Sequence, residues 1–432
     1  MTVSVFLFSL LGAMAIGMPI AYSLLICGLA LMGFMAATGA LPAFDSQILA
    51  QRFVDGADNF PLLAVPFFLL AGEFMNAGGL SRRIVNLAMA WVGHFRGGLG
   101  YVAVLAAVIM ASLSGSAVAD TAALAALLIP MMKRAGYELN RSAGLIAAGG
   151  IIAPVIPPSI GMIVFGVAGN VSITKLFLAG IVPGILMGAA IGATWWWIAK
   201  RDLIQPAPRM PMGERLKVTA AGGWALALPV VILGGMKFGV FTPTEAAVVA
   251  AVYSFVVGMF VYGELKWREL YALVLAAGKT TAVVMFLVAA AMVSAWLITV
   301  ANIPGEVVTM LQPFMDNKTI LMFMMMVIVV IVGTALDFTP TVLILTPVLM
   351  PVVLKAGIDP VYFGVLFIMN NAIGLITPPV GTVLNVVCGV AKISLDDSFK
   401  GVMPFFLAQL AVLFLLVLFP DIVLVPLKFL MQ

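Results

Sequence analysis

The stretch Ile151-Ile-Ala-Pro-Val-Ile-Pro-Pro-Ser159 has a counterpart in the second half of the chain, Gly374-Leu-Ile-Thr-Pro-Pro-Val-Gly381. A shift of 221 positions, the difference between residues 157 and 378, superposes the two Pro-Pro pairs without a gap. Each copy places two helix-breaking prolines inside apolar sequence. These coincidences indicate an internal duplication. The same shift also superposes Pro130 on Pro351, Ala135-Gly136 on Ala356-Gly357, Ile152 on Ile373, Gly180 on Gly401 and Pro183 on Pro404.

The composition is that of a membrane protein. Of the 432 residues, 63% are hydrophobic and only 9% are charged, whereas a soluble domain carries about 25% charged residues. Because so few charges cannot cover a water-exposed surface, we expect an all-α polytopic protein in contact with the lipid bilayer. One His and two Cys exclude a Cys/His cluster for a transition metal. The net charge of +4 reflects loop residues and does not indicate a nucleic-acid partner.

The densest basic stretch separates the two copies. Lys200-Arg201, Arg209, Arg215 and Lys217 lie within a short span with only Asp202 and Glu214 opposing them. Cytoplasmic loops of membrane proteins carry such an excess of Lys and Arg. We therefore predict a first half over residues 1–200, a cytoplasmic connecting loop over 201–218 and a second half over 219–432.

Both halves contain apolar segments that are too short to cross a bilayer, which takes about 20 helical residues. In lipid, irregular backbone survives only where protein or a cavity covers it, and matched pairs of broken segments are typical of transporter binding sites. The pattern predicts hairpins near 112–132 and 333–354 and helix breaks at 153–159 and 374–381. The repeats could be inverted or parallel. We favour inverted repeats, because two oppositely oriented halves can open one site to either side.

Polar groups at these places are candidates for a cation site. At the first hairpin, five polar groups lie in the ten residues 112–121. Carboxylates at membrane depth are costly and usually functional. Hydroxyl and freed carbonyl oxygens would suit Na⁺. Alternatively, the serines of the first hairpin allow close helix packing, and Asp120 and Asp337 act as helix N-caps. The candidates are Ser112, Ser114, Gly115, Ser116, Asp120, Gly333, Asp337, Thr339, Thr341 and Thr377.

A second group of residues is predicted to bind an anionic substrate. Helix N-termini exposed at the breaks would direct partial positive charge toward an anion, and arginine pairs with carboxylates in a bidentate way. Alternatively, Arg52 pairs with Asp55 or Asp58, and Thr377 satisfies backbone groups freed by the neighbouring prolines. The candidates are Arg52, Pro157, Ser159, Asn371, Thr377, Pro378 and Asn385.

With these residues in view, the chain resembles the large membrane subunit, the DctM-type permease, of tripartite ATP-independent periplasmic (TRAP) transporters. The resemblance covers essentially the whole chain, and within the family it is greatest to importers of sugar acids such as sialic acid or diketogulonate. The matching stretches are Asp58 to Glu73, Ser112 to Asp120, Ala153 to Ser159, Phe241-Thr-Pro-Thr-Glu-Ala246, Asp337-Phe-Thr-Pro-Thr341, Gly374 to Gly381 and Phe419-Pro-Asp421.

The resemblance implies an elevator-type importer, similar to the ion transporter superfamily, in a bacterial inner membrane. It implies Na⁺ as the coupling ion without another cofactor, and an organic anion as substrate, either a sugar acid or a C4-dicarboxylate. It also implies two partners, a small DctQ-type membrane subunit and a periplasmic substrate-binding protein. The family's cation sites lie around its two hairpins, which here are the stretches Ser112 to Asp120 and Asp337 to Thr341.

Three other functions compete with this interpretation. A gated anion channel predicts a ring of like charges along a pore, and the apolar segments contain no basic ring. A membrane enzyme is disfavoured because common catalytic motifs are absent and His94 is the single histidine. A stand-alone Na⁺/dicarboxylate symporter would need no binding protein. Such symporters show Ser-Asn-Thr at the hairpin tips, where this chain has Ser-Gly-Ser and Thr-Pro-Pro.

Overall fold

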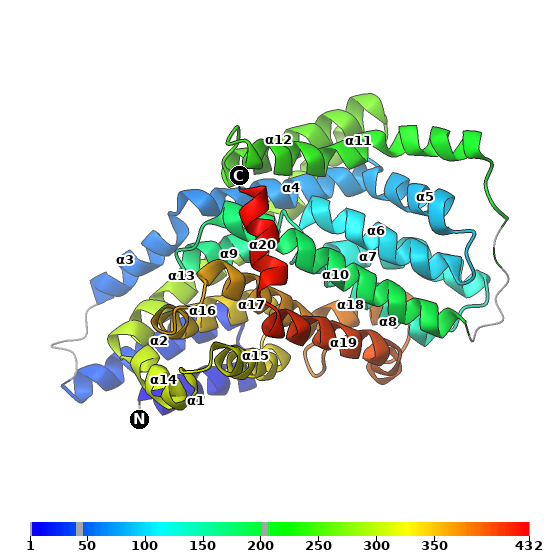
Figure 1. The fold of residues 1–432 in the computed structure, drawn as a ribbon. Helices are drawn as coiled ribbons and strands as arrows, with labels where there is room; N and C mark the ends of the chain where they lie inside the picture. Colours follow the sequence, from blue (N-terminus) through cyan, green and yellow to red (C-terminus); the bar gives the residue numbers. More distant parts are fainter. Residues whose placement is uncertain (1, 40–45, 201–205, 207, 432) are drawn as a thin grey trace.

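The computed structural model describes residues 2–39, 46–200, 206 and 208–431, and the regular elements in these residues are all helices (Figure 1). Eight helices of the described part are long and apolar enough to cross a membrane. The prediction of an all-α polytopic membrane protein is therefore confirmed. The eight candidate spans are Ile20–Ala37, Phe60–Ala77, Ile173–Ala199, Met212–Lys237, Pro243–Val261, Trp267–Val300, Phe338–Lys355 and Leu395–Leu418.

Ten α-helices precede residue 200 and ten follow it in the described part of the chain. Those of the first half are α1 Thr2–Ala15, α2 Ile20–Ala37, α3 Ser46–Ala57, α4 Ala64–Ala77, α5 Leu80–Val92, α6 Gly98–Ser114, α7 Ala117–Arg134, α8 Leu139–Gly150, α9 Ile160–Ala168 and α10 Ile173–Ala199. Those of the second half are α11 Met212–Lys237, α12 Pro243–Val256, α13 Trp267–Val300, α14 Ile303–Leu311, α15 Lys318–Ala335, α16 Phe338–Lys355, α17 Pro360–Gly374, α18 Thr382–Ala391, α19 Leu395–Leu418 and α20 Asp421–Leu430.

The predicted connecting loop is shorter than expected at its C-terminal end. α11 begins at Met212, so residues 212–218 continue into a helix instead of forming a loop. Arg201 and Asp202 lie outside the described residues. A proline just before the first turn, Pro211, is well placed to start a helix.

The helix boundaries follow the 221-residue shift. α7 and α16 begin and end 221 positions apart, at residues 117 and 338 and at residues 134 and 355. The pairs α6 and α15, α8 and α17, α9 and α18, and α10 and α19 agree with the same shift to within three residues. Both Pro-Pro doublets stand in the non-helical segments between the third and fourth helices of these sets, and both doublets contain a cis peptide bond.

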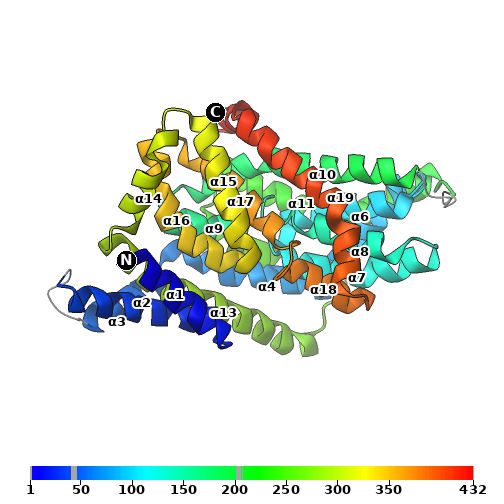
Figure 2. The same cartoon turned by 90° about the horizontal axis from the view of Figure 1, so that it is seen from below.

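Corresponding helices of the two halves pack crosswise. α8 lies against α19 and α10 lies against α17, while α7 lies against α18 and α16 lies against α9. Figures 1 and 2 both show α8 beside α19. At their crossing the backbones touch, because a methyl group added to Gly401 would collide with the carbonyl of Asn140. Small residues permit such close approach between helices in membranes. The two sets of five helices therefore form one interlocked core.

The two predicted hairpins are pairs of antiparallel helices with tips inside this core. The first consists of α6 and α7, with its tip at Gly115, and the second of α15 and α16, with its tip at Leu336-Asp337. The first arm of each hairpin is longer than expected, because α6 begins at Gly98 and α15 begins at Lys318, whereas α7 and α16 end at Arg134 and Lys355, close to the predicted ends. In Figures 1 and 2, α6 and α7 extend to the right and α15 and α16 to the left.

Candidate functional site

The tip of the first hairpin holds a buried carboxylate. Gly115 has φ +63°, a left-handed conformation that reverses the chain without the steric cost of a side chain. Ser116 caps α7 by accepting a hydrogen bond from the Ala119 N–H at 3.4 Å. Ser114 Oγ donates to Asp120 Oδ1 at 2.5 Å. Asp120 is only 3% exposed, and its Oδ2 has no hydrogen-bond partner.

A second unpartnered oxygen follows Asp120 directly. Thr121 Oγ1 is buried without a partner, and it faces Gly150 at the end of α8. Buried polar atoms in native proteins are nearly always satisfied, so an orphaned pair calls for an explanation such as a bound ion. Carboxylate and hydroxyl oxygens are the ligands that a hard cation takes. The pair Asp120 and Thr121 therefore fits a small cation at the first hairpin.

The first helix break lies directly on this tip. A methyl group on Gly115 would collide with the carbonyl oxygen of Pro158. Ser159 is fully buried and caps α9: its Oγ donates to the Pro154 carbonyl at 2.6 Å and accepts from the Met162 N–H at 3.2 Å. Pro157 is buried as well. The hydroxyl of Ser159 thus satisfies the interrupted backbone, and the break packs tightly onto the hairpin tip.

The tip of the second hairpin carries a half-buried carboxylate. Asp337 precedes α16, but its side chain makes no cap hydrogen bond. Its Oδ1 accepts a hydrogen bond from Thr382 Oγ1 at 3.2 Å, and its carbonyl accepts from Thr341 Oγ1 at 2.9 Å. Thr339 follows in the first turn of α16 and is half-buried. The pair Asp337 and Thr382 joins the second hairpin to the helix that follows the second break.

Asn370 and Asn371 of α17 place two more unpartnered oxygens against the second hairpin. Asn371 Nδ2 donates to the Phe338 carbonyl at 2.6 Å, and its Oδ1 has no partner and faces Gly333. Asn370 Nδ2 donates to the Met326 carbonyl at 2.7 Å, and its Oδ1 is also unpartnered. Both side chains are buried. The second hairpin therefore has its own set of buried oxygens with unused acceptor capacity.

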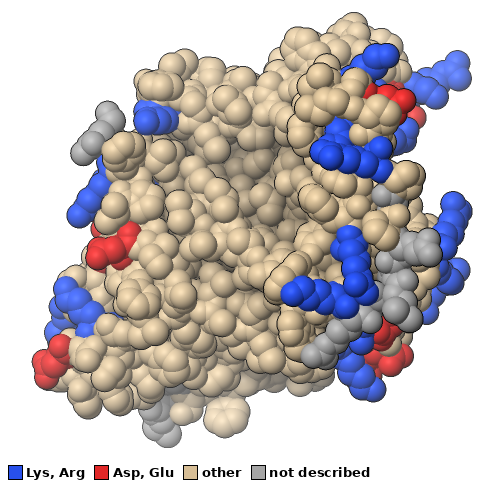
Figure 3. Space-filling model, turned by 45° about the vertical axis from the view of Figure 1, so that its right-hand side comes forward, with Lys and Arg blue, Asp and Glu red and all other residues tan. Residues whose placement is uncertain are grey.

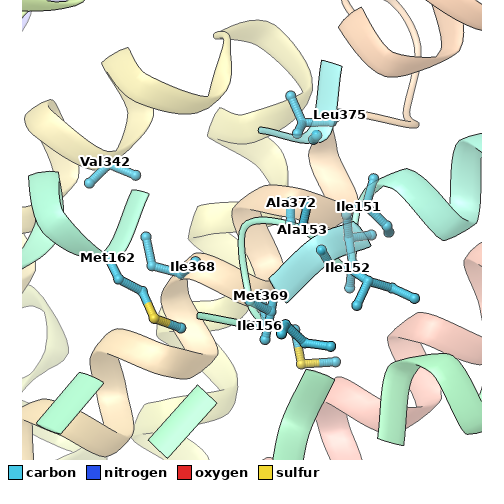
Figure 4. Close-up of a cluster of buried hydrophobic side chains, with 14 of the residues drawn as sticks. Ile151, Ile152, Ala153, Ile156, Met162, Val342, Ile368, Met369, Ala372 and Leu375 are labelled. Atoms are coloured by element: carbon cyan, nitrogen blue, oxygen red, sulfur yellow. The ribbon is translucent and has the colours of Figure 1, made fainter. Parts of the chain in front are cut away.

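The two hairpin regions meet at the centre of the molecule. A methyl group on Gly161, at the start of α9, would collide with the ring of Phe338 at the second tip. Figure 4 shows buried side chains of the first break in one cluster with side chains of α17, among them Ala153 near Ala372 and Ile156 near Met369. Apolar packing therefore connects the first break to α17 in the interior of the molecule.

The two breaks differ in exposure. The residues around Pro157 and Pro158 are buried, whereas Pro378 and Pro379 are exposed. Thr377 is half-buried, and its Oγ1 donates to the Ile373 carbonyl at 3.0 Å. Asn385 is exposed, and its Nδ2 donates to the Val380 carbonyl at 2.7 Å. The second break therefore lies at the surface of the chain, whereas the first break is enclosed.

Two further predicted site residues make other contacts. Arg52 is exposed on α3, which packs on α13, and its guanidinium is 5.7 Å from the centroid of the Trp296 ring. Among the described residues it makes no ion pair with Asp55 or Asp58. Ser112 is half-buried, and its hydroxyl donates to the carbonyl of Ile109 in its own helix at 2.6 Å. Arg52 is thus directed to the ring of Trp296, while Ser112 lies in the last turn of α6 with its hydroxyl bonded within that helix.

Thr382 contacts the candidate residue Asp337 and is not among the residues predicted from the sequence. It lies 45 positions from Asp337 in the chain, and only the fold brings their oxygens together. The available signal was its place directly after Gly381, at the first position beyond the second break.

Asp337→Asn is expected to weaken Na⁺ dependence moderately. The asparagine keeps the size of the side chain but removes a charge that is partly screened by its exposure, so we expect about a threefold rise in the half-saturating Na⁺ concentration. Uptake at graded Na⁺ concentrations measures this value. The exposed Asp316 provides the control variant Asp316→Asn, and a wild-type curve for Asp337→Asn would remove Asp337 from the cation site.

Comparison with known proteins places this architecture in one family. The family model "Tripartite ATP-independent periplasmic transporter, DctM component" matches residues 7–422. The chain is 58% identical to the 2,3-diketo-L-gulonate TRAP transporter large permease protein of Escherichia coli, over 99% of both chains. It is 37% identical to the sialic acid TRAP transporter large permease protein of Vibrio cholerae, over 96% of both chains.

A solved structure shares the fold. The YdaH transporter of Alcanivorax borkumensis superposes with a TM-score of 0.68 at 15% sequence identity, covering 92% of this chain and 96% of that one. Eight apolar helices and the named relatives together identify a multi-pass protein of the bacterial inner membrane. The chain belongs to the DctM family, the large membrane permease subunits of tripartite ATP-independent periplasmic transporters.

Proposed function

We propose that this permease imports an organic anion by Na⁺-coupled symport and has no enzymatic activity. The observation that carries the proposal is the set of buried oxygens without hydrogen-bond partners, on Asp120 and Thr121 at one hairpin and on Asn370 and Asn371 at the other. Oxygens of this kind suit a small hard cation at an interrupted helix. Neighbouring helix N-termini at α9 and α18 would favour an anion.

The architecture supports inverted repeats and an elevator-type movement. Matching helix boundaries support the duplication, and hairpins that extend in opposite directions support opposite orientations of its copies (Figure 2). Because α6–α10 and α15–α19 interlock, they would move as one rigid body that carries both polar clusters. Such movement of one bundle against another is a common form of alternating access.

A sugar acid is the favoured substrate. The relative at 58% identity is named for 2,3-diketo-L-gulonate and another at 37% for sialic acid. A C4-dicarboxylate is the second candidate, since a relative at 38% identity from Pseudomonas aeruginosa is named for that class. Each Na⁺ that enters releases about 2.3 kcal/mol per 100 mV. Two ions would therefore exceed the electrical cost of importing one singly charged anion.

The family's tripartite organisation supports two partners. A small DctQ-type membrane subunit and a periplasmic substrate-binding protein would complete the transporter, and the binding protein would deliver the anion. A relative from Oleidesulfovibrio alaskensis is named as a permease protein DctMQ, and this chain covers 64% of it at 38% identity. The extra length of that relative leaves room for a second subunit in the same polypeptide.

Uptake by reconstituted permease tests the proposal. In proteoliposomes that contain the permease and its small subunit, we expect uptake of labelled diketogulonate only with an inward Na⁺ gradient and with the binding protein outside. Replacing Na⁺ by K⁺ should reduce uptake to the level of empty vesicles. Unchanged uptake in K⁺ would refute Na⁺ coupling, and full uptake without the binding protein would instead support the stand-alone symporter.

A further inference from the structure

A cavity lies between the loop that joins α5 to α6 and the C-terminal end of α10. Its volume is about 540 Å³, and its walls are mainly aromatic and aliphatic. It lies at the beginning of α6, at the opposite end of that helix from the hairpin tip, and the proposed transport mechanism does not use it. The residues that line it are Val92, Phe95, Arg96, Tyr101, Trp196, Ala199 and Lys200.

Two cationic side chains and an exposed indole stand at this cavity. Lys200 Nζ lies 3.4 Å from the centroid of the Trp196 ring, a cation–π contact that holds the ammonium group over the wall of the cavity. Trp196 is 53% exposed although it lies on an apolar helix. Trp residues with this exposure are typical of the interface between the bilayer and water. The cavity therefore opens at the level of lipid headgroups.

Further positive charge surrounds the same loop. Arg215 of α11 is only 3% exposed, its Nε has no hydrogen-bond partner, and its Nη2 is 3.5 Å from His94 Nδ1. The pKa of His94 is lowered by burial and by the positive charges of Arg215 and Arg209, as expected in a positive environment. The ion pairs among the described residues involve Arg82, Arg83 and Arg141, and none of them neutralises Lys200 or Arg215.

The same end of the molecule shows this imbalance at its surface. In Figure 3 the right-hand end of the molecule comes forward, and Lys and Arg outnumber Asp and Glu on it. Lys200 leads into the basic connecting segment, which the positive-inside rule places in the cytoplasm. Cytoplasmic leaflets carry anionic lipids, and basic pockets between transmembrane helices on this side bind their headgroups.

From these observations we infer that the cavity binds the headgroup of an anionic phospholipid of the inner leaflet. The phosphate lies between Lys200 and Arg96, and an acyl chain follows the apolar wall formed by Phe95, Tyr101 and Trp196. The aromatic walls distinguish this ligand from free phosphate, because an inorganic anion would gain nothing from them. A bound lipid of this kind would fix the end of α10 to the loop between α5 and α6.

Native mass spectrometry of the full-length chain in detergent tests the inference. We expect phosphatidylglycerol to bind more tightly than phosphatidylethanolamine. Lys200→Gln should weaken phosphatidylglycerol binding about fivefold, the factor that ~1 kcal/mol per basic residue gives. Lys237→Gln is the matched control, because Lys237 also stands at the end of a helix beside an aromatic ring, that of Phe238, but is not among the residues that line this cavity.

A second variant separates headgroup from acyl-chain recognition. Phe95→Ala should weaken both lipids by a similar factor, because it removes apolar wall and leaves the contact between Lys200 and Trp196 in place. Equal affinity of the wild-type chain for the two lipids would overturn the inference. So would an unchanged phosphatidylglycerol affinity in Lys200→Gln, or competition by inorganic phosphate or glycerol phosphate at concentrations similar to the lipid. All these measurements concern binding, so their outcome is independent of Na⁺-coupled transport.

Discussion

Asp120→Asn is expected to raise the Na⁺ concentration for half-maximal uptake by about 10-fold to 100-fold. The asparagine keeps the volume of Asp120 and can still accept the hydrogen bond from Ser114 Oγ, but it removes the buried negative charge. An interaction with a charged group contributes about 1.5 to 3 kcal/mol, which corresponds to this range of affinity. Uptake in proteoliposomes at graded Na⁺ concentrations measures the shift.

The control for Asp120→Asn is a carboxylate outside the core. Asp316 is exposed in the segment between α14 and α15, so Asp316→Asn should retain the wild-type Na⁺ curve. Elution of both variants as folded protein in size-exclusion chromatography separates a binding defect from a folding defect. If folded Asp120→Asn retained wild-type Na⁺ dependence, the carboxylate of the first hairpin would have no part in the cation site.

We expect that most molecules of the Gly401→Val variant do not fold stably. The added side chain meets the carbonyl of Asn140 on α8. Because this carbonyl belongs to the backbone, no change of side-chain rotamer can relieve the clash. Overpacking of a core costs about 1 to 3 kcal/mol and sometimes more. For the contact between α8 and α19 we expect a cost at the upper end of this range. The yield of monodisperse protein in detergent and its melting temperature measure the loss.

Gly223→Val is the matched control for this substitution. Gly223 also lies within a long apolar helix, α11, but no atom lies within 4 Å of an added Cβ there. Both variants replace a helical glycine by the same β-branched residue, so intrinsic helix propensity changes equally. A similar yield from the two variants would contradict the proposed role of the close crossing.

The interrupted helices were predictable from the sequence because they depend on local chemistry. Pro157-Pro158 and Pro378-Pro379 cannot continue a helix, and the structure has non-helical segments at both places. The link between Ser114 and Asp120 was also foreseeable, since the two residues are six positions apart at one hairpin tip. Local breaks and short-range contacts are therefore visible without coordinates.

Contacts between distant segments were not predictable. The bond between Asp337 and Thr382 and the approach of Gly401 to Asn140 depend on how the helices cross. Arg52 has the right chemistry for a carboxylate, but it lies on a peripheral helix beside Trp296. The first arms of the two hairpins, α6 and α15, begin earlier than the predicted 112 and 333, because each is one continuous helix up to its tip. These contacts depend on tertiary packing, which local sequence patterns do not reveal.

The crosswise packing of the two halves has a consequence for biosynthesis. α8 ends at Gly150, and its packing partner α19 begins 245 residues later, at Leu395. At about 5 to 20 residues per second, the ribosome needs roughly 12 to 50 s to make that partner. During this time α8 lies in the membrane without α19, the helix that packs against it. A nascent chain that is truncated before Leu395 should therefore be a substrate for membrane quality-control proteases.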